Sequence, residues 1–329
     1  MRSSTNNFPK GGTPLRKLIP LLIFIFLFTG CATAQPETSV TPSGGFPYTF
    51  TDSTGASVTA AEKPQTVAVL LSSLADVWVS AGGCVDITVG EAVERGFADE
   101  TTILVDSGAG KTIDLELLIA SEPDLVIYST EIAGQTECAA ALTAAGIPAA
   151  GFRVDTFDEY LSLLKICTDL TGKAENYETC GTQLQSEIHK IIAFAQNQAA
   201  QKDILFVRAG SSARYTKAKT ADNNFVCKML DDLGARNIAD AAPILLDGLS
   251  LEAILTADPD VIFYTTMGDE ATGTAYMESL LADPVWSNLT AVKEGRVYHL
   301  PKDLFQYKPN ARWDEAYAHL AELLYGELP

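Results

Sequence analysis

One stretch of fourteen residues occurs twice in this chain, and the second copy begins 136 positions after the first. Asp114–Ile127 reads DLELLIASEPDLVI, and Ser250–Phe263 reads SLEAILTADPDVIF. Each copy joins a short helical stretch to a strand through a Pro-Asp pair, because Pro ends a helix and the apolar run after it suits a buried strand. A duplicated helix–turn–strand unit predicts two similar α/β lobes. Two lobes imply a cleft between them, and clefts are where ligands bind.

Residues 1–30 have the pattern of an export signal. Arg16 and Lys17 precede the apolar stretch Leu18–Phe28, which is about half the ~20 residues that span a bilayer. Small residues then precede Cys31, which resembles a bacterial lipoprotein signal in which Cys31 is acylated. Residues 31–45 are polar and lack periodicity, as expected of a tether. We therefore expect an extracytoplasmic protein that a lipid anchors to the outer face of the cytoplasmic membrane.

The charge of the chain limits its partners. The first thirty residues carry four basic and no acidic residues, so their removal changes the net charge from −19 to −23. Such acidity disfavours nucleic acid and anionic lipid surfaces.

Five cysteines remain beyond Cys31, and they cannot all pair within one molecule. No CxxC spacing occurs, and small buried apolar positions suit most of them. A Cys84–Cys138 disulfide is one pairing that the sequence leaves open. The five residues are Cys84, Cys138, Cys167, Cys180 and Cys227.

Strand and helix patterns alternate along the chain, which predicts parallel sheets with both faces covered by helices. The longest helical pattern is Ala174–Gln201; it would extend roughly 40 Å at about 1.5 Å per residue. It lies between the two repeat copies, so we predict that it connects the lobes. The expected domains are therefore residues 46–173, the connecting helix 174–201, and residues 202–329.

Four loops should lie at the carboxyl ends of strands, where ligands of open α/β lobes bind. Ser72 and Ser129 are candidate contacts on the first two, and Ser72-Ser73 can also cap the helix that follows. The loops are Leu71–Ala75, Ser129–Gly134, Arg208–Lys219 and Thr265–Ala271.

The third loop concentrates positive charge in an acidic protein. Such a cluster could bind carboxylate, phosphate or catecholate oxygens, since Arg can bind these bidentately. A solvated charged loop is the alternative. The candidates are Arg208, Arg214, Tyr215, Lys217 and Lys219.

A second aromatic and basic group precedes the last helical pattern and could face a flat ligand. Its alternative is that Trp313 belongs to the core. The group comprises Phe305, Gln306, Tyr307, Lys308, Arg312 and Trp313.

The histidines argue against capture of a bare metal ion. Only His189, His299 and His319 occur, and none has another metal-ligating residue at suitable spacing. A bound iron or cobalt ion would therefore need an organic chelator. One axial ligand to haem from Tyr215, Tyr307 or His299 stays open.

Several segments together resemble the substrate-binding proteins of ABC importers that handle iron–siderophore complexes, haem and cobalamin. They are the hairpin FTDSTGASVT, the paired LE…PD units, Asp231–Asp240 (DDLGARNIAD) and Val285–Pro301 (VWSNLTAVKEGRVYHLP). The resemblance implies two α/β lobes joined by one long helix, a ligand in the cleft, and little lobe closure on binding. It also implies that an acidic residue of each lobe docks on the permease. The candidates are Glu131 or Glu137, and Asp269 or Glu270.

We therefore expect a receptor that delivers a chelated metal to an ABC permease and needs no cofactor of its own. A ferric siderophore is the first choice because the basic loop suits an anionic chelate. Haem and a cobamide are the alternatives within the family. An exported enzyme acting on a tetrapyrrole or chelate is the alternative from another class, and the scarcity of histidine as a general base argues against it.

Overall fold

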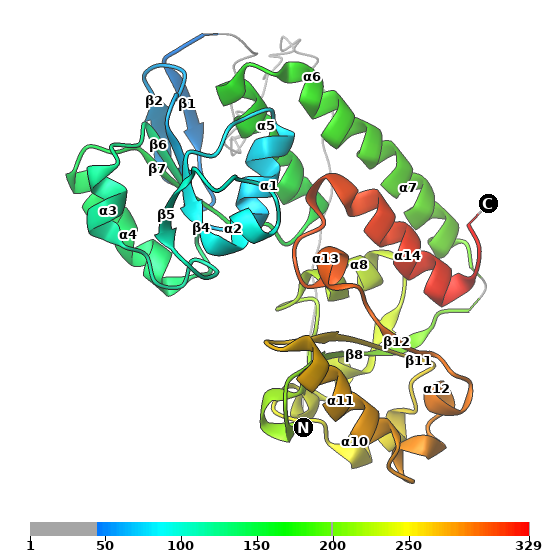
Figure 1. Cartoon of the computed structure of the whole chain (residues 1–329). Coiled ribbons are helices and arrows are strands. Elements are labelled where there is room, and N and C mark those ends of the chain that lie inside the picture. The colour runs from blue at the N-terminus through cyan, green and yellow to red at the C-terminus, as the bar shows by residue number, and fades with distance from the viewer. Residues whose placement is uncertain (1–44, 199, 329) are drawn as a thin grey trace, which may run out of the picture. The chain divides into compact units, whose positions relative to one another are not determined.

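The protein has two α/β lobes, each built on a parallel sheet (Figure 1). The computed structural model describes residues 45–198 and 200–328, so the predicted signal, the lipidation residue Cys31 and nearly all of the tether lie outside the described residues. Within that range, none of the helices combines the length and the apolar character needed to cross a membrane. The predicted fold class is confirmed.

The N-terminal lobe begins with a hairpin and continues into a five-stranded parallel sheet of order β5-β4-β3-β6-β7. The hairpin strands are β1 (Tyr48–Thr51) and β2 (Ser57–Ala60). The sheet strands are β3 (Val67–Val69), β4 (Ile87–Val89), β5 (Ile103–Asp106), β6 (Leu125–Ser129) and β7 (Ala149–Phe152). The helices are α1 (Ser72–Ser80), α2 (Gly90–Glu94), α3 (Leu115–Ala120), α4 (Ala133–Ala144) and α5 (Phe157–Thr171).

The C-terminal lobe repeats this plan with the order β10-β8-β11-β12, and a short β9 pairs antiparallel with β8. Its strands are β8 (Asp203–Ala209), β9 (Lys217–Ala218), β10 (Arg236–Asn237), β11 (Val261–Thr266) and β12 (Val297–His299). Its helices are α8 (Phe225–Asp232), α9 (Ile238–Ala241), α10 (Leu251–Ala257), α11 (Glu270–Leu281), α12 (Thr290–Lys293), α13 (Lys302–Phe305) and α14 (Trp313–Tyr325).

The two repeat copies fold as α3–β6 and α10–β11 and share their turn chemistry. Glu122 and Asp258 occupy equivalent positions, and both have a left-handed backbone, with φ of 48° and 42°. Two residues later, the Asp124 carboxylate accepts the Gln65 and Thr66 amides at 2.8 and 2.9 Å. The carboxylate of its equivalent, Asp260, accepts the Asp203 amide at 2.9 Å. The repeated Asp thus ties each repeat strand to the start of the central strand beside it.

Glycine at the left-handed turn of the repeat should stabilise the N-terminal copy but not the C-terminal copy. Glu122→Gly should raise the free energy of unfolding by about 0.5–1 kcal/mol, because an L-residue is strained there and the Glu122 side chain is exposed. Asp258→Gly should give no gain, because the Asp258 carboxylate accepts the Thr290 amide at 2.8 Å and its hydroxyl at 2.7 Å. Urea denaturation measures both; equal shifts would contradict the assignment.

A helix connects the lobes, as predicted, but it is shorter than predicted. Helical backbone runs without interruption from α6 (Ala174–Tyr177) through one π-helical turn (Glu178–Thr182) to α7 (Gln183–Gln196). It ends five residues before Gln201. Asn197 closes it, and its side-chain amide donates to the Ala193 carbonyl at 2.8 Å, which satisfies a carbonyl of the last turn.

One hydrophobic cluster runs through both lobes. It includes Val69 and Phe152 from the first sheet and Phe206 and Phe263 from the second. Trp313 is fully buried within it. Its ring lies edge-on to Phe157 of the N-terminal lobe at 6.2 Å and to Phe225 of the C-terminal lobe at 6.0 Å. The lobes are therefore joined by shared packing as well as by a helix.

All five cysteines of the described residues carry free thiols, so the Cys84–Cys138 pairing left open by the sequence does not form. Cys138, Cys167 and Cys227 are buried, whereas Cys84 is exposed. Burial raises the pKa of the Cys227 thiol, which keeps it protonated and unreactive.

Candidate functional site

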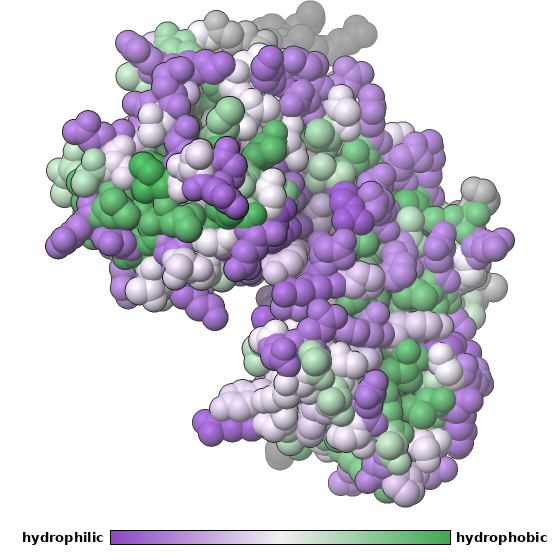
Figure 2. Space-filling model, in the orientation of Figure 1, coloured by the Kyte–Doolittle hydropathy of each residue, from purple (hydrophilic) through white to green (hydrophobic). Residues whose placement is uncertain are grey.

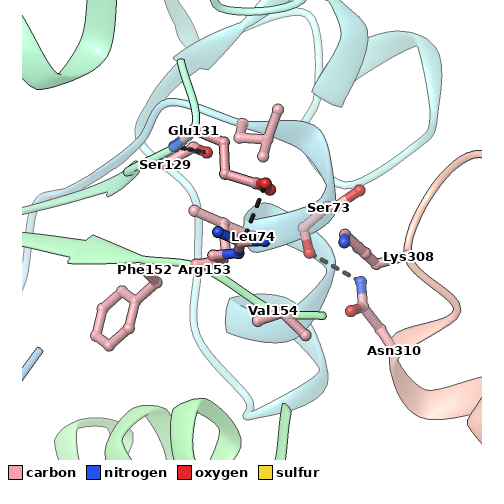
Figure 3. Close-up of a pocket in the computed structure, with 10 residues that line it drawn as sticks. Ser73, Leu74, Ser129, Glu131, Phe152, Arg153, Val154, Lys308 and Asn310 are labelled. Atoms are coloured by element: carbon pink, nitrogen blue, oxygen red, sulfur yellow. Dashed lines mark hydrogen bonds and ion pairs between the residues drawn. The ribbon is translucent and has the colours of Figure 1, made fainter. Parts of the chain in front are cut away.

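A small pocket lies at the carboxyl ends of β3, β6 and β7 (Figure 3), the sheet edge where ligands of open α/β lobes are expected. Two of its lining residues come from the segment after α13. Figure 2 shows that the surface is hollowed between the two lobes and that hydrophilic residues border the hollow. The lining residues of the pocket are Leu71, Ser73, Leu74, Ser129, Glu131, Phe152, Arg153, Val154, Lys308 and Asn310.

Gln135, fully buried on α4, holds the loops of this edge together. Its carbonyl accepts the Ser129 amide at 2.7 Å. Its amide nitrogen donates to the Leu70 and Gly110 carbonyls at 2.6 and 2.9 Å. One side chain thereby fixes the ends of β3 and β6 and the loop after β5, which keeps this wall of the pocket rigid.

Gln135→Leu should lower the free energy of unfolding by about 2–4 kcal/mol, because it leaves one amide and two carbonyls buried without partners. Gln183→Leu, at an exposed position of α7, is the matched control and should change stability by less than about 0.5 kcal/mol. Thermal denaturation followed by circular dichroism compares them. Equal stabilities of the two variants would show that the hydrogen bonds of Gln135 do not stabilise the fold.

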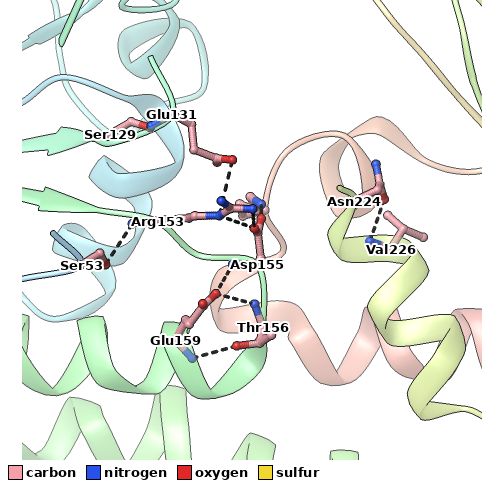
Figure 4. Close-up of polar contacts among 10 residues, drawn as sticks. Ser53, Ser129, Glu131, Arg153, Asp155, Thr156, Glu159, Asn224 and Val226 are labelled. Carbon is pink, nitrogen blue, oxygen red and sulfur yellow. Dashed lines mark hydrogen bonds and ion pairs between the residues drawn. The ribbon is translucent and has the colours of Figure 1, made fainter. Parts of the chain in front are cut away.

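Asp155 is a buried anionic centre beside the pocket (Figure 4). Its carboxylate accepts from Arg153 Nε at 2.5 Å and from Lys308 Nζ at 2.7 Å. Burial would raise the pKa of this carboxyl, but Lys308 and Arg153 outweigh burial and hold the pKa below its ordinary value. Arg153 also lies 3.7 Å from Glu131. The cations on this side of the cleft therefore already have counter-charges.

Three cations of the basic loop in the C-terminal lobe lack such counter-charges. Arg208 is the penultimate residue of β8 and lies directly opposite Lys217 in the β8–β9 pair. Lys219 follows two residues after Lys217, so all three share one face. Among the described residues, none of the three forms an ion pair. Burial, then Arg208 and Lys217, lower the pKa of Lys219. Burial likewise lowers the pKa of Arg208. Half-buried positive charges thus crowd together at the carboxyl end of β8.

The other residues of the basic loop are more exposed. The Arg214 guanidinium lies 5.6 Å from the centre of the Tyr215 ring, and the Tyr215 side chain is 49% exposed. Tyr215 therefore presents an accessible aromatic face in the same loop as the three cations.

The second aromatic and basic group is dispersed. Tyr307 is flanked by two cations, with Arg95 at 4.0 Å and Lys302 at 5.0 Å from its ring centre. Arg312 bonds Asp303 and Glu315, each at 2.8 Å, and so is neutralised. Trp313 has no exposed surface, so its ring belongs to the core and cannot face a ligand in this conformation.

The two candidate serines are also enclosed. Ser72 is fully buried; its hydroxyl donates to Glu91 at 2.5 Å and accepts from Arg95 at 2.9 Å. Ser72 and Ser73 lie inside α1, whose N-cap is Leu71 without a side-chain cap, so the predicted capping is wrong. Ser129 is only 2% exposed but lines the pocket.

The four acidic docking candidates differ in their exposure and in their contacts with other residues. Glu131 lies beside Arg153, and Glu137 is exposed on α4. The Asp269 carboxylate caps α11 by accepting the Thr272 amide at 2.8 Å. Glu270, the first residue of α11, is exposed and lies 3.9 Å from His299.

The histidines lie apart from one another. His299 stacks on Tyr264 with ring centres 4.7 Å apart, His319 lies 5.7 Å from Phe305, and His189 is exposed on α7. In the part of the chain that the structure describes, no three His, Cys, Asp or Glu side chains converge as a metal site would require.

Sequence reasoning missed Arg153 and Asp155, and a signal for them was present. Arg153 follows β7 directly and Asp155 comes two residues later. The loop after β7 belongs to the same carboxyl edge as the four candidate loops. Arg95, Gln135 and Asn310 carried no such signal, because their importance lies in contacts distant along the chain.

A protein-family model matches most of this chain. The model of the periplasmic binding protein family matches residues 66–304. An uncharacterised ABC transporter substrate-binding lipoprotein, YvrC of Bacillus subtilis (strain 168), is 24% identical over 93% of this chain and 95% of its own length.

Two solved structures share the fold at lower identity. The apo form of the haem-binding protein RhuT from Roseiflexus sp. RS-1 is 20% identical, with a TM-score of 0.64, and covers 79% of this chain and 98% of its own. Staphylococcus aureus SirA complexed with staphyloferrin B is 19% identical, with a TM-score of 0.63, and covers 84% and 97%. This chain belongs to the periplasmic binding protein family.

Proposed function

We propose that this chain is the extracytoplasmic substrate-binding component of an ABC importer and that it captures an anionic ferric siderophore between its lobes. The observation that carries the proposal is the half-buried cluster of Arg208, Lys217 and Lys219, which has no counter-ion among the described residues. Placing like charges together away from water is unfavourable unless an anion joins them. A chelate with carboxylate or catecholate oxygens supplies that anion, and Arg can bind it bidentately.

The charge distribution also predicts how the ligand lies. On the N-terminal side, Asp155 and Glu131 already neutralise Arg153 and Lys308. The anionic groups of the ligand should therefore face the C-terminal lobe. The exposed Tyr215 ring can pack on an aromatic part of the chelate.

A ligand panel tests the proposal directly. Carboxylate and catecholate ferric siderophores, haem and a cobamide are titrated while the fluorescence of the three tryptophans and the visible absorption spectrum are recorded. We expect quenching at micromolar or lower concentration by a ferric siderophore only. A shifted haem spectrum without siderophore binding would overturn the choice of siderophore. Haem would then be the bound molecule, with a residue such as Tyr215 or His299 as the axial ligand of its iron.

Relatives support the ligand class without fixing it. RhuT is named for haem binding, and the SirA structure holds staphyloferrin B. The proposal also includes binding without turnover, so a ligand released by denaturing the complex should be recovered intact. A chemically altered product would instead assign the chain to the enzymes.

Delivery requires a permease, and Glu270 is the best-placed docking residue of the C-terminal lobe because it is exposed while Asp269 caps its helix. Glu270→Lys should reduce uptake several-fold in cells and leave ligand affinity unchanged. Glu278→Lys, exposed further along α11, is the matched control and should transport normally. A loss of ligand affinity in Glu270→Lys would refute this assignment.

A further inference from the structure

A second connection between the lobes is made by the segment Tyr307–Asn310, here called the strap, which leads from α13 to α14. Three of its residues contact the N-terminal lobe. Tyr307 lies under the Arg95 guanidinium at 4.0 Å. Lys308 bonds Asp155 at 2.7 Å. Asn310 donates to α1, as described next.

Asn310 makes the most constrained of these contacts. It is 1% exposed, and its side-chain nitrogen donates to the Ser73 carbonyl at 2.8 Å and to the Asp76 carboxylate at 2.9 Å. Its backbone is left-handed, with φ of 51°. Asn tolerates this conformation better than most residues, but it remains strained. The strain persists because this backbone conformation aims the amide group at α1.

The strap also belongs to the ligand pocket. Lys308, Asn310 and Ser73 all line it. A shift of the strap relative to α1 would therefore change both the spacing of the lobes and the shape of the pocket wall. Three residues beyond Asn310, Trp313 packs against both lobes. The chain that follows the strap is therefore also fixed to both lobes.

We propose that Asn310 is a positioning residue that pins the strap to α1 and so fixes the spacing of the lobes at which ligand is bound. Its effect on ligand rests on the proposed function, but its effect on lobe spacing does not. The Asn310 side chain touches both α1 residues directly, so its removal breaks a contact between the lobes whether or not ligand is present.

The experiment measures the distance between the lobes without ligand. Asn310→Gly keeps the left-handed backbone accessible and removes both hydrogen bonds. One nitroxide label is attached to the native, exposed Cys84 and a second to Ser287→Cys, with Cys180→Ser removing the remaining accessible thiol of the described residues. Pulsed electron spin resonance should show a broader distance distribution for Asn310→Gly than for the parent. Asn288→Gly is the control, because the Asn288 side chain donates to the Pro284 carbonyl four residues earlier and makes no contact with the N-terminal lobe among the hydrogen bonds of the described residues.

A conservative variant gives a readout that a general loss of stability would not produce. In Asn310→Asp, two carboxyl groups face each other. They can share a proton at pH 5, which restores a hydrogen bond, but they repel at pH 8. The broadening should therefore appear at pH 8 and largely disappear at pH 5, whereas Asn310→Gly should be broad at both. The other titratable groups that face Asp76 are Arg95, Arg312, Tyr160 and Cys180. Cys180 is replaced by Ser in every labelled protein, and the other three are unchanged in all variants.

The ligand arm separates this inference from the proposed function. Asn310→Gly should bind the ferric siderophore about tenfold more weakly, mainly through faster dissociation. If the distances broaden and no siderophore binds even the parent, the positioning role stands and the ligand assignment fails. If Asn310→Gly gives the parent distribution, the positioning role is wrong whatever the protein binds.

Discussion

Replacing Arg208, Lys217 and Lys219 together by Gln should weaken binding of an anionic ferric siderophore by at least about a hundredfold. Each cation is half-buried without an acidic partner among the described residues. Hydrogen bonds to charged groups contribute about 1.5–3 kcal/mol each, so even two such bonds exceed the roughly 2.7 kcal/mol of a hundredfold change. Tryptophan quenching at low and high salt measures the loss. Parent affinity should fall with salt, and the variant should respond little.

The control for this variant carries the same change in net charge. Lys63, Lys190 and Lys293 are exposed and are replaced together by Gln. Affinity should change by less than about threefold, since charges farther than about 10 Å are screened in 0.1 M salt. Equal losses in both variants would mean that overall charge, and not the cluster, attracts the ligand. The cluster variant should also be no less stable than the parent, because it removes mutual repulsion.

Replacing Trp313 by Ala should lower the free energy of unfolding by about 3–5 kcal/mol, the range for deleting a large buried aromatic ring. The expected cause is a cavity between Phe157 and Phe225. Trp313→Phe should cost much less, because the indole nitrogen of Trp313 is buried without a hydrogen-bond partner and Phe removes it. Urea denaturation followed by circular dichroism measures both variants.

The comparison with Trp286→Ala distinguishes shared packing from ordinary core packing. Trp286 is 4% exposed and belongs to a cluster confined to the C-terminal lobe. Both alanine variants should be destabilised, but only Trp313→Ala should separate unfolding into two transitions, because it loosens the contact between lobes. A single transition in Trp313→Ala would contradict the view that this ring couples them.

The architecture could be predicted from the repeat because each repeated element is specified by residues that are close together in the sequence. Fourteen residues specify a helix, a left-handed turn and a buried strand in each lobe, and both copies form these elements. The end of the connecting helix was predicted less well, because the helical pattern was extended to Gln201, whereas the helix closes at Asn197 through a side-chain hydrogen bond. Periodicity alone does not mark such an end.

The geometry of the candidate site could be predicted only in part. The basic loop could be recognised because its charges are clustered in sequence, and β9 brings Lys217 back opposite Arg208. The strap could not, because Lys308 meets Asp155 across 153 residues and Asn310 meets Ser73 across 237. The burial of Ser72 and Trp313 depends on neighbours from other elements, which a residue pattern along one segment does not contain.

The hydrophobic cluster that runs through both lobes has a consequence for how such receptors can be re-engineered. Grafting a whole lobe from a relative would set foreign residues against Trp313, Phe157 and Phe225, and the hybrid should misfold or aggregate. Exchanging only the loops at the strand ends leaves that contact intact. The two lobes share one plan but can no longer be exchanged as modules. Ligand specificity should therefore be changed by substitutions in the loops.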